Sequence, residues 1–223
     1  MAWQKTIAIG AMLCLMICTA FLADAQPAVA QPAAAKPAAL SIADAWAQAA
    51  YQTPQADRFA AFSALADRAR REAKNDDAAS LIWKGICIST LAGEKPGLGS
   101  LKLVREARAA FRAAIKLDKN ALEGAAQMSL GALYYKLPAF PVSFGSKRKA
   151  RRLLNQALEI SPESMDANFF MADFLATIGE LDAARRHIEI GLDAPLRPSR
   201  RVADLGRRDE LRGLLAKINA PAG

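Results

Sequence analysis

Apolar residues in the second half of the chain recur at the spacing of α-helices. One face of a first helix is marked at i, i+3, i+4 and i+7 by Asn168, Met171, Ala172 and Leu175. A second helix follows, with Ala184, Ile188 and Gly191 on one side. Gly179 between the two favours a helix end, because glycine adopts the left-handed conformation without a steric penalty. The pattern predicts a helix–turn–helix hairpin over residues 166–198.

A similar hairpin precedes it over residues 121–162. Small residues recur 34 positions apart in two pairs, Ala150 with Ala184 and Ala157 with Gly191. Such a period is typical of stacked helical hairpins, in which small residues let paired helices approach closely. The connection inside this copy contains Pro138 and Pro141, which cannot donate to a helical hydrogen bond. We therefore expect a loop over residues 137–145.

The remaining segments also predict helices. A degenerate third copy has small and apolar residues at Leu81, Gly85, Ile88, Ala107, Phe111 and Ala114. Alanine-rich helices are expected over residues 41–51 and 57–74, and period-two runs of β-branched residues are absent. The last segment, residues 202–218, has an apolar stripe at Leu211, Leu214, Leu215 and Ile218. We expect it to cap the stack, with Arg207, Arg208 and Arg212 on its outer side.

The small, aromatic and proline positions resemble the tetratricopeptide (TPR) pattern. In the copy over residues 121–162 they are Gly131, Tyr134, Ala150, Ala157 and Pro162. The resemblance implies an all-α fold, a right-handed stack of helical hairpins (a TPR-like α-solenoid). It would have about three repeats, extra N-terminal helices and a C-terminal capping helix. The alternative is an unrelated array of helical hairpins.

A narrower likeness is carried by the loop after the Tyr134–Tyr135 pair. Tyr134 to Pro138, Phe140–Pro141 and Phe144–Gly145 resemble a subgroup of exported bacterial TPR-like proteins, similar to the periplasmic T component of TRAP transporters. The TPR resemblance also implies a concave face lined by the first helix of each pair. Carried over position by position, its lining would be Ile82, Ile86, Met128, Tyr135, Phe169 and Asp173. This mainly apolar groove suits an amphipathic peptide or a small apolar ligand; alternatively, the first helices or the loop from Pro138 to Gly145 fold over it and make it core.

The beginning of the chain has the pattern of a secretory signal peptide over residues 1–25. Lys5 precedes an apolar run over residues 7–22, and small residues follow at Ala23 and Ala25. We expect cleavage and a periplasmic location; the alternative is an uncleaved anchor in the inner membrane. Residues 26–39, rich in alanine, proline and glutamine, predict a disordered linker. Residues 40–223 then form the helical domain.

The net charge of +8 is concentrated after residue 100, where 21 basic residues face 14 acidic ones. The densest group, called here the basic cluster, comprises Lys147, Arg148, Lys149, Arg151 and Arg152. It follows Ser146, an expected N-cap, and cations at a helix N-terminus are unfavourable. An acidic neighbour such as Glu123 or Glu163 would offset this cost, as would an anionic partner such as an acidic protein or a phospholipid surface. Otherwise the cluster is a solvated face.

Residues with catalytic chemistry are sparse. His187, the single histidine, lies beside Arg185 and Arg186 and is expected on the surface. Neither a set of metal ligands at fixed spacing nor a nucleophile beside a base is visible. We therefore expect no catalysis, no metal and no cofactor. After cleavage the remaining cysteine is Cys87, either a buried inert thiol or an exposed one.

These patterns lead to two hypotheses. The first is a periplasmic, non-catalytic protein–protein interaction module, a scaffold or adaptor that docks a protein partner. The second is a carrier of a small apolar ligand, or an accessory component of a TRAP-type solute transporter. Nucleic acid is not an expected partner, because export removes the chain from it. Aromatic residues are also not interleaved with the cations as a single-strand groove needs.

Overall fold

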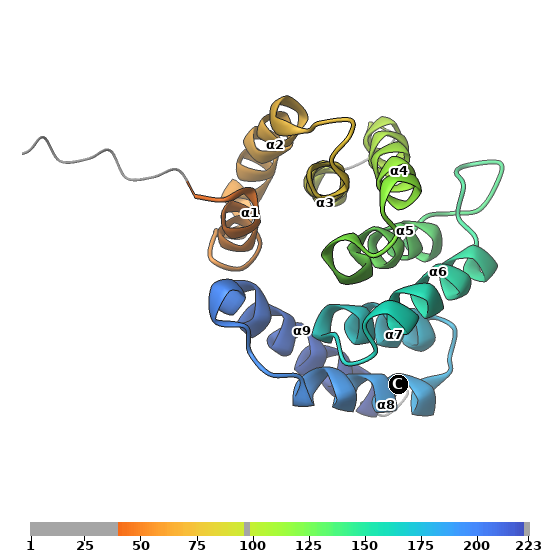
Figure 1. Cartoon of the computed structure of the whole chain (residues 1–223). Coiled ribbons are helices and arrows are strands. Elements are labelled where there is room, and N and C mark those ends of the chain that lie inside the picture. Colours follow the sequence, from red (N-terminus) through yellow and green to blue (C-terminus); the bar gives the residue numbers. More distant parts are fainter. Residues whose placement is uncertain (1–39, 96–98, 221–223) are drawn as a thin grey trace, which may run out of the picture. The chain divides into compact units, whose positions relative to one another are not determined.

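The computed structural model describes residues 40–95 and 99–220, which fall in one compact unit (Figure 1). These residues form nine α-helices and two short 3-10 helices and contain no strand, which confirms the all-helical prediction. The segments expected as signal peptide and linker, residues 1–25 and 26–39, lie outside the described part. None of the helices described is both long and apolar enough to cross a bilayer.

The first helices in chain order are α1 (Ile42–Tyr51), α2 (Gln55–Glu72), α3 (Ala78–Glu94) and α4 (Ser100–Leu117). The middle of the chain forms η1 (Ala121–Gly124), α5 (Ala125–Lys136) and α6 (Lys147–Ile160). The last part forms α7 (Met165–Thr177), α8 (Leu181–Asp193), η2 (Pro198–Arg200) and α9 (Arg201–Asn219). The helices α1 to α8 pack in consecutive pairs, α1 with α2, α3 with α4, α5 with α6 and α7 with α8.

Small residues allow close approach within these pairs. A Cβ added to Gly85 of α3 would lie 2.4 Å from Cε1 of Phe111 on α4. One added to Gly131 of α5 would lie 3.0 Å from Cγ of Leu154 on α6. The recurring alanines Ala107, Ala150, Ala157, Ala172 and Ala184 have no exposed surface. The small positions seen in the sequence are therefore the contact positions of the hairpins.

Helix ends follow the sequence signals. The Ser146 side chain accepts a hydrogen bond from the amide of Lys149 at 3.3 Å, which caps α6. Gly179 ends α7 with a φ of +86°. Residues 137–146 form the expected loop between α5 and α6. These features orient each helix for packing with its pair.

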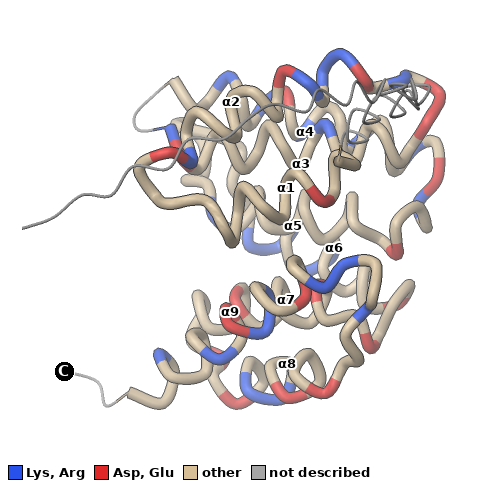
Figure 2. Tube along the Cα trace, turned by 90° about the vertical axis from the view of Figure 1, so that its left-hand side faces the viewer, with Lys and Arg blue, Asp and Glu red and all other residues tan. Residues whose placement is uncertain are grey.

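The helix α9 joins the last hairpin to the first helix. It packs on α7 and α8, as expected of a cap, and beside them in both views (Figures 1 and 2). It also packs on α1, so that the series of helix contacts closes on itself. At this closure a Cβ added to Gly206 would lie 2.3 Å from Cδ1 of Tyr51. Side chains from α1, α3, α5 and α7 consequently line a common pocket with α9.

The expectation that Arg207 lies on the outer side of α9 is wrong. Arg207 is 8% exposed and turned toward α7, whereas Arg212 is exposed as expected. The reason is helical register: Arg207 precedes the fully buried Leu211 by four residues and so shares its face. Arg208 is half-buried and donates to the carbonyl oxygen of Ala194 at 2.8 Å.

Candidate functional site

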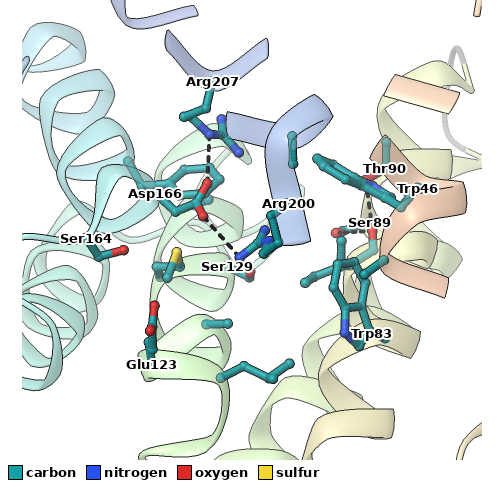
Figure 3. Close-up of a pocket in the computed structure, with 18 of the residues that line it drawn as sticks. Trp46, Trp83, Ser89, Thr90, Glu123, Ser129, Ser164, Asp166, Arg200 and Arg207 are labelled. Carbon is teal, nitrogen blue, oxygen red and sulfur yellow. Dashed lines mark hydrogen bonds and ion pairs between the residues drawn. The ribbon is translucent and has the colours of Figure 1, made fainter. Parts of the chain in front are cut away.

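A cavity of about 430 Å³ lies between α1, α3, α5, α7 and α9, with η1 and η2 at its border (Figure 3). It is called here the central cavity. Its larger apolar side chains include Trp46, Tyr51, Trp83, Ile86, Met128 and Phe170. Its polar lining includes Ser89, Thr90, Glu123, Ser129, Lys136, Ser164, Asp166, Arg200 and Arg207. Figure 3 shows the two tryptophans on one side and Asp166, Ser164 and Glu123 on the other.

The two tryptophans form an aromatic wall. Trp46 of α1 and Trp83 of α3 have ring centroids 6.4 Å apart and planes inclined by 55°. The indole Nε1 of Trp46 donates to the hydroxyl of Thr90 at 3.0 Å, and this hydroxyl donates to the carbonyl oxygen of Ile86 at 2.9 Å. Tyr51 packs edge-on against Trp46 with centroids 5.8 Å apart. The wall is thus oriented by its own contacts, without a ligand.

The opposite wall is built on a partly buried ion-pair network around Asp166. Its carboxylate lies 2.9 Å from Nε of Arg207, 3.1 Å from Nη2 of Arg197 and 3.6 Å from Nη1 of Arg200. Burial alone would raise the pKa of Asp166, but the three guanidinium groups outweigh it and lower the pKa to about 2. Asp166 is therefore ionised at neutral pH.

Arg207 is held on several sides at once. Its guanidinium lies over the rings of Phe169 and Phe170, 4.3 and 5.0 Å from their centroids. It also pairs with Glu210 on its own helix. This combination of ion pairs and ring stacking satisfies a buried guanidinium that has little access to water. The arginine consequently fixes α9 against α7.

Arg197 and Asp204 anchor the connection from α8 to α9. The side chain of Asp204 is 1% exposed and accepts from the backbone amide of Arg197 at 2.7 Å and from its Nη2 at 2.6 Å. Nη1 of Arg197 also lies 3.6 Å from Glu123 of η1. The network therefore ties η1, α7 and α9 together along one border of the central cavity.

Two polar groups of the central cavity are free to bind a ligand. The hydroxyl of Ser129 and the indole N–H of Trp83 have no hydrogen-bond partner among the described residues. Arg200 contributes a half-buried guanidinium whose one acidic neighbour there, Asp166, is 3.6 Å away. A cavity with apolar walls and a few open donors can hold a molecule that is mostly apolar and carries a small number of acceptor atoms.

The residues predicted for the groove are divided between this cavity and the core. Ile86 and Met128 line the cavity. Ile82 is fully buried in the main core, and Phe169 lies under Arg207 beside the cavity-lining Phe170. Tyr135 is buried and donates from its hydroxyl to Asp173 at 2.6 Å, and Asp173 also pairs with Lys136 at 2.9 Å. Ile82, Tyr135, Phe169 and Asp173 are outside the cavity lining.

Sequence reasoning did not single out the aromatic wall or the ion-pair network. Trp46 and Trp83 are the tryptophans that remain beyond residue 25, in segments otherwise dominated by alanine and aliphatic residues. A bulky aromatic residue on such a helix was the available signal for the wall. For the network, the available signal was that Arg207 lies four residues before Leu211 and so shares the buried face of the same helix.

The basic cluster lies at the start of α6, as predicted. Arg151 pairs with Glu180 at 2.5 Å and lies over Phe174, and Lys149 lies over the ring of Tyr134. The acidic neighbour is thus Glu180, not Glu123 or Glu163, because Glu123 faces Arg197. In the part of the chain described, Lys147, Arg148 and Arg152 have no ion pair.

Two other side chains with titratable groups, His187 and Cys87, are packed into the fold. His187 is half-buried rather than on the surface, with Nδ1 2.8 Å from Oδ1 of the buried Asn168. Burial, together with Arg186, lowers its pKa. Cys87 is fully buried, and burial raises the pKa of its thiol to about 12. No group of three or more possible metal ligands occurs within residues 40–95 and 99–220.

Comparison with known proteins gives this chain no family. No protein-family model matches the sequence, and no curated protein matches it significantly.

Proposed function

We propose that this protein binds a small, mainly apolar ligand in the central cavity. The observation that carries the proposal is the cavity of about 430 Å³, bordered by an oriented pair of indoles and a partly buried ion-pair network. Ligand sites in proteins commonly have volumes of about 300–1,000 Å³, mostly apolar walls and a few placed polar groups. The cavity meets each of these conditions.

The lining also supports an elongated ligand. Along α5 the lining residues extend from Ala125 to Lys136, the full length of the helix. At 1.5 Å per residue this corresponds to about 17 Å. An acyl chain or a flat multi-ring compound has suitable dimensions, with its polar end near Arg200 or Ser129 and its apolar body against the tryptophans.

This ligand role is favoured over a peptide docked in the same place. α1 and α9 both line the cavity and contact each other, which leaves less room for an extended chain than an open groove would. The repeat spacing supports a TPR-like stack of hairpins, and the N-terminal pattern supports export to the periplasm. In that setting the protein would act without catalysis, as a carrier or as an accessory component of a TRAP-type solute transporter. A scaffold role at another surface is compatible with it.

The test is a titration with N-phenyl-1-naphthylamine, an uncharged probe whose fluorescence rises in apolar sites. Wild type is compared with Ala132→Phe, which places a ring where a cavity-lining alanine stands. The matched control is Ala113→Phe on the exposed side of α4. We expect micromolar binding by wild type and by the control, and binding weakened about tenfold or more by Ala132→Phe, because its ring occupies part of the ligand volume.

Circular dichroism establishes that each variant is folded before binding is compared. If Ala132→Phe does not fold, Ser129→Leu fills the same wall from a half-buried position. Equal probe affinity in the folded cavity variants and in the control contradicts the proposal. Native mass spectrometry of the protein purified from its cells then identifies any ligand that it carries.

A further inference from the structure

The most exposed large apolar side chains lie together at one loop. Phe140 is 89% exposed and Val142 is 55% exposed, the two highest values for large apolar residues in the described part of the chain. Both belong to residues 140–143, called here the loop tip, between α5 and α6. Isolated apolar residues on a surface are ordinary, but two at the end of one projecting loop form a specific feature.

The base of this loop is held by several interactions. The amide of Gly145 donates to the carbonyl oxygen of Pro138 at 3.0 Å, and that of Ser146 donates to Tyr134 at 2.7 Å. Phe144 turns inward against Tyr134, with ring centroids 5.6 Å apart, and Arg108 lies over it at 4.5 Å. One phenylalanine of the loop therefore anchors it, while Phe140 is left in solvent.

Uncompensated positive charge adjoins the loop tip. Lys147 and Arg148 follow the loop directly, and Arg152 lies one turn further along α6. These three have no ion pair among the described residues. Elsewhere, acidic and basic residues are interspersed, as Figure 2 shows along α8. Repulsion among these cations and the direction of the helix dipole both disfavour them within the fold, so folding does not account for Lys147, Arg148 and Arg152.

We infer that the loop tip and the basic cluster together bind the surface of a bilayer that contains acidic phospholipid. Phe140 and Val142 enter the boundary between headgroups and acyl chains, and Lys147, Arg148 and Arg152 meet the lipid phosphates. Charge complementarity selects an anionic surface. A lipid surface fits better than a protein, because two apolar side chains are far from the roughly 800 Å² per partner of a stable protein interface. Each cation near such a surface strengthens binding about fivefold.

The test is co-sedimentation with vesicles of phosphatidylcholine, with and without about a third of phosphatidylglycerol. Two variants remove the proposed contacts: Phe140→Ala, and the triple variant Lys147→Gln, Arg148→Gln, Arg152→Gln. Their matched controls are Leu117→Ala, which removes another exposed apolar side chain, and the triple variant Arg186→Gln, Arg201→Gln, Lys217→Gln. All variants share residues 1–39, so any contribution of that segment cancels.

We expect wild type and both controls to bind the acidic vesicles within twofold of each other. The basic-cluster variant should bind about tenfold or more weakly and Phe140→Ala about threefold or more weakly, because each lacks one part of the contact. Wild-type binding should also fall as salt rises. Equal binding to neutral vesicles, or a basic-cluster variant that binds like its control, overturns the inference.

Insertion of the loop tip is measured separately with Phe140→Trp. The added fluorescence should be quenched by vesicles with brominated acyl chains, and substitution of Leu117 by tryptophan should give no added quenching. Quenching that is equal for the two, under conditions where the protein is bound, overturns insertion. Millimolar glycerol phosphate should leave vesicle binding intact; loss of binding would show a site for soluble phosphate compounds instead of a bilayer.

Discussion

Asp166 is the carboxylate on which the charged wall of the central cavity depends. It is 15% exposed and faces Arg197, Arg200 and Arg207. A buried charge is tolerable only when it is paired, and removal of one partner leaves the other charges without compensation.

Asp166→Asn is therefore predicted to lower the free energy of unfolding by about 3 kcal/mol or more. Chemical denaturation followed by circular dichroism measures the loss. Asp182→Asn is the control, because this aspartate pairs with Arg185 but has a side chain that is 89% exposed, and exposed pairs contribute little. Similar losses in the two variants would show that the network does not stabilise the fold.

The same carboxylate predicts how stability depends on pH. Its pKa is lowered in the folded protein to about 2, from an ordinary value of 3.8. Because the pKa of Asp166 is lower in the folded protein, its ionised carboxylate stabilises the fold at pH values above the ordinary pKa of 3.8. This stabilisation is lost as the pH falls toward 2. The difference between the two pKa values corresponds to about 2 kcal/mol in the free energy of unfolding.

The prediction is that wild type loses about 2 kcal/mol more than Asp166→Asn between pH 5 and pH 2. Denaturation curves at several pH values in this window supply the measurement. Parallel pH profiles for the two proteins would mean that Asp166 is not ionised preferentially in the folded state.

At the level of helices, α9 offers a comparison between two glycines. A Cβ at Gly206 would overlap Tyr51 of α1, whereas one at Gly213 would meet nothing within 4 Å. Gly206→Ala is predicted to loosen the contact between α1 and α9 and to destabilise the protein by about 1–3 kcal/mol. Gly213→Ala should stabilise it by about 0.5–1 kcal/mol, because alanine favours the helix.

Thermal melts of the two variants test this pair. Their melting temperatures should move in opposite directions from wild type. A Gly206→Ala protein as stable as wild type would show that α1 and α9 do not pack as closely as described.

The helices, the long loop and the close contacts within pairs were predictable, because each depends on residues near one another in sequence. The lining of the central cavity was not. In α5, every residue from Ala126 to Tyr135 except Ser129 is buried, so apolar periodicity cannot tell the face toward the cavity from the face toward the core. When the groove positions of the TPR pattern are carried over to such a helix, they select Tyr135 as readily as Met128. Tyr135 is buried against Phe174, whereas Met128 lines the cavity.

The contact between α1 and α9 was also invisible in sequence. It joins residues 42–51 to residues 201–219, and no repeat spacing relates these segments. The last segment was expected to cap the end of the stack. A glycine facing a tyrosine across the closure, Gly206 against Tyr51, becomes meaningful only when both are placed in space.

Closure by α9 has a consequence for how the protein is made. An array of hairpins whose units contact only their neighbours can fold progressively as it emerges during synthesis. Here the contact of α1 with α9 links segments some 150 residues apart, from Tyr51 to Arg201. Forming this contact costs the loop-closure entropy of that long separation. The central cavity therefore acquires its last wall only when the end of the chain arrives, and a chain truncated before Arg201 would lack the wall that α9 provides.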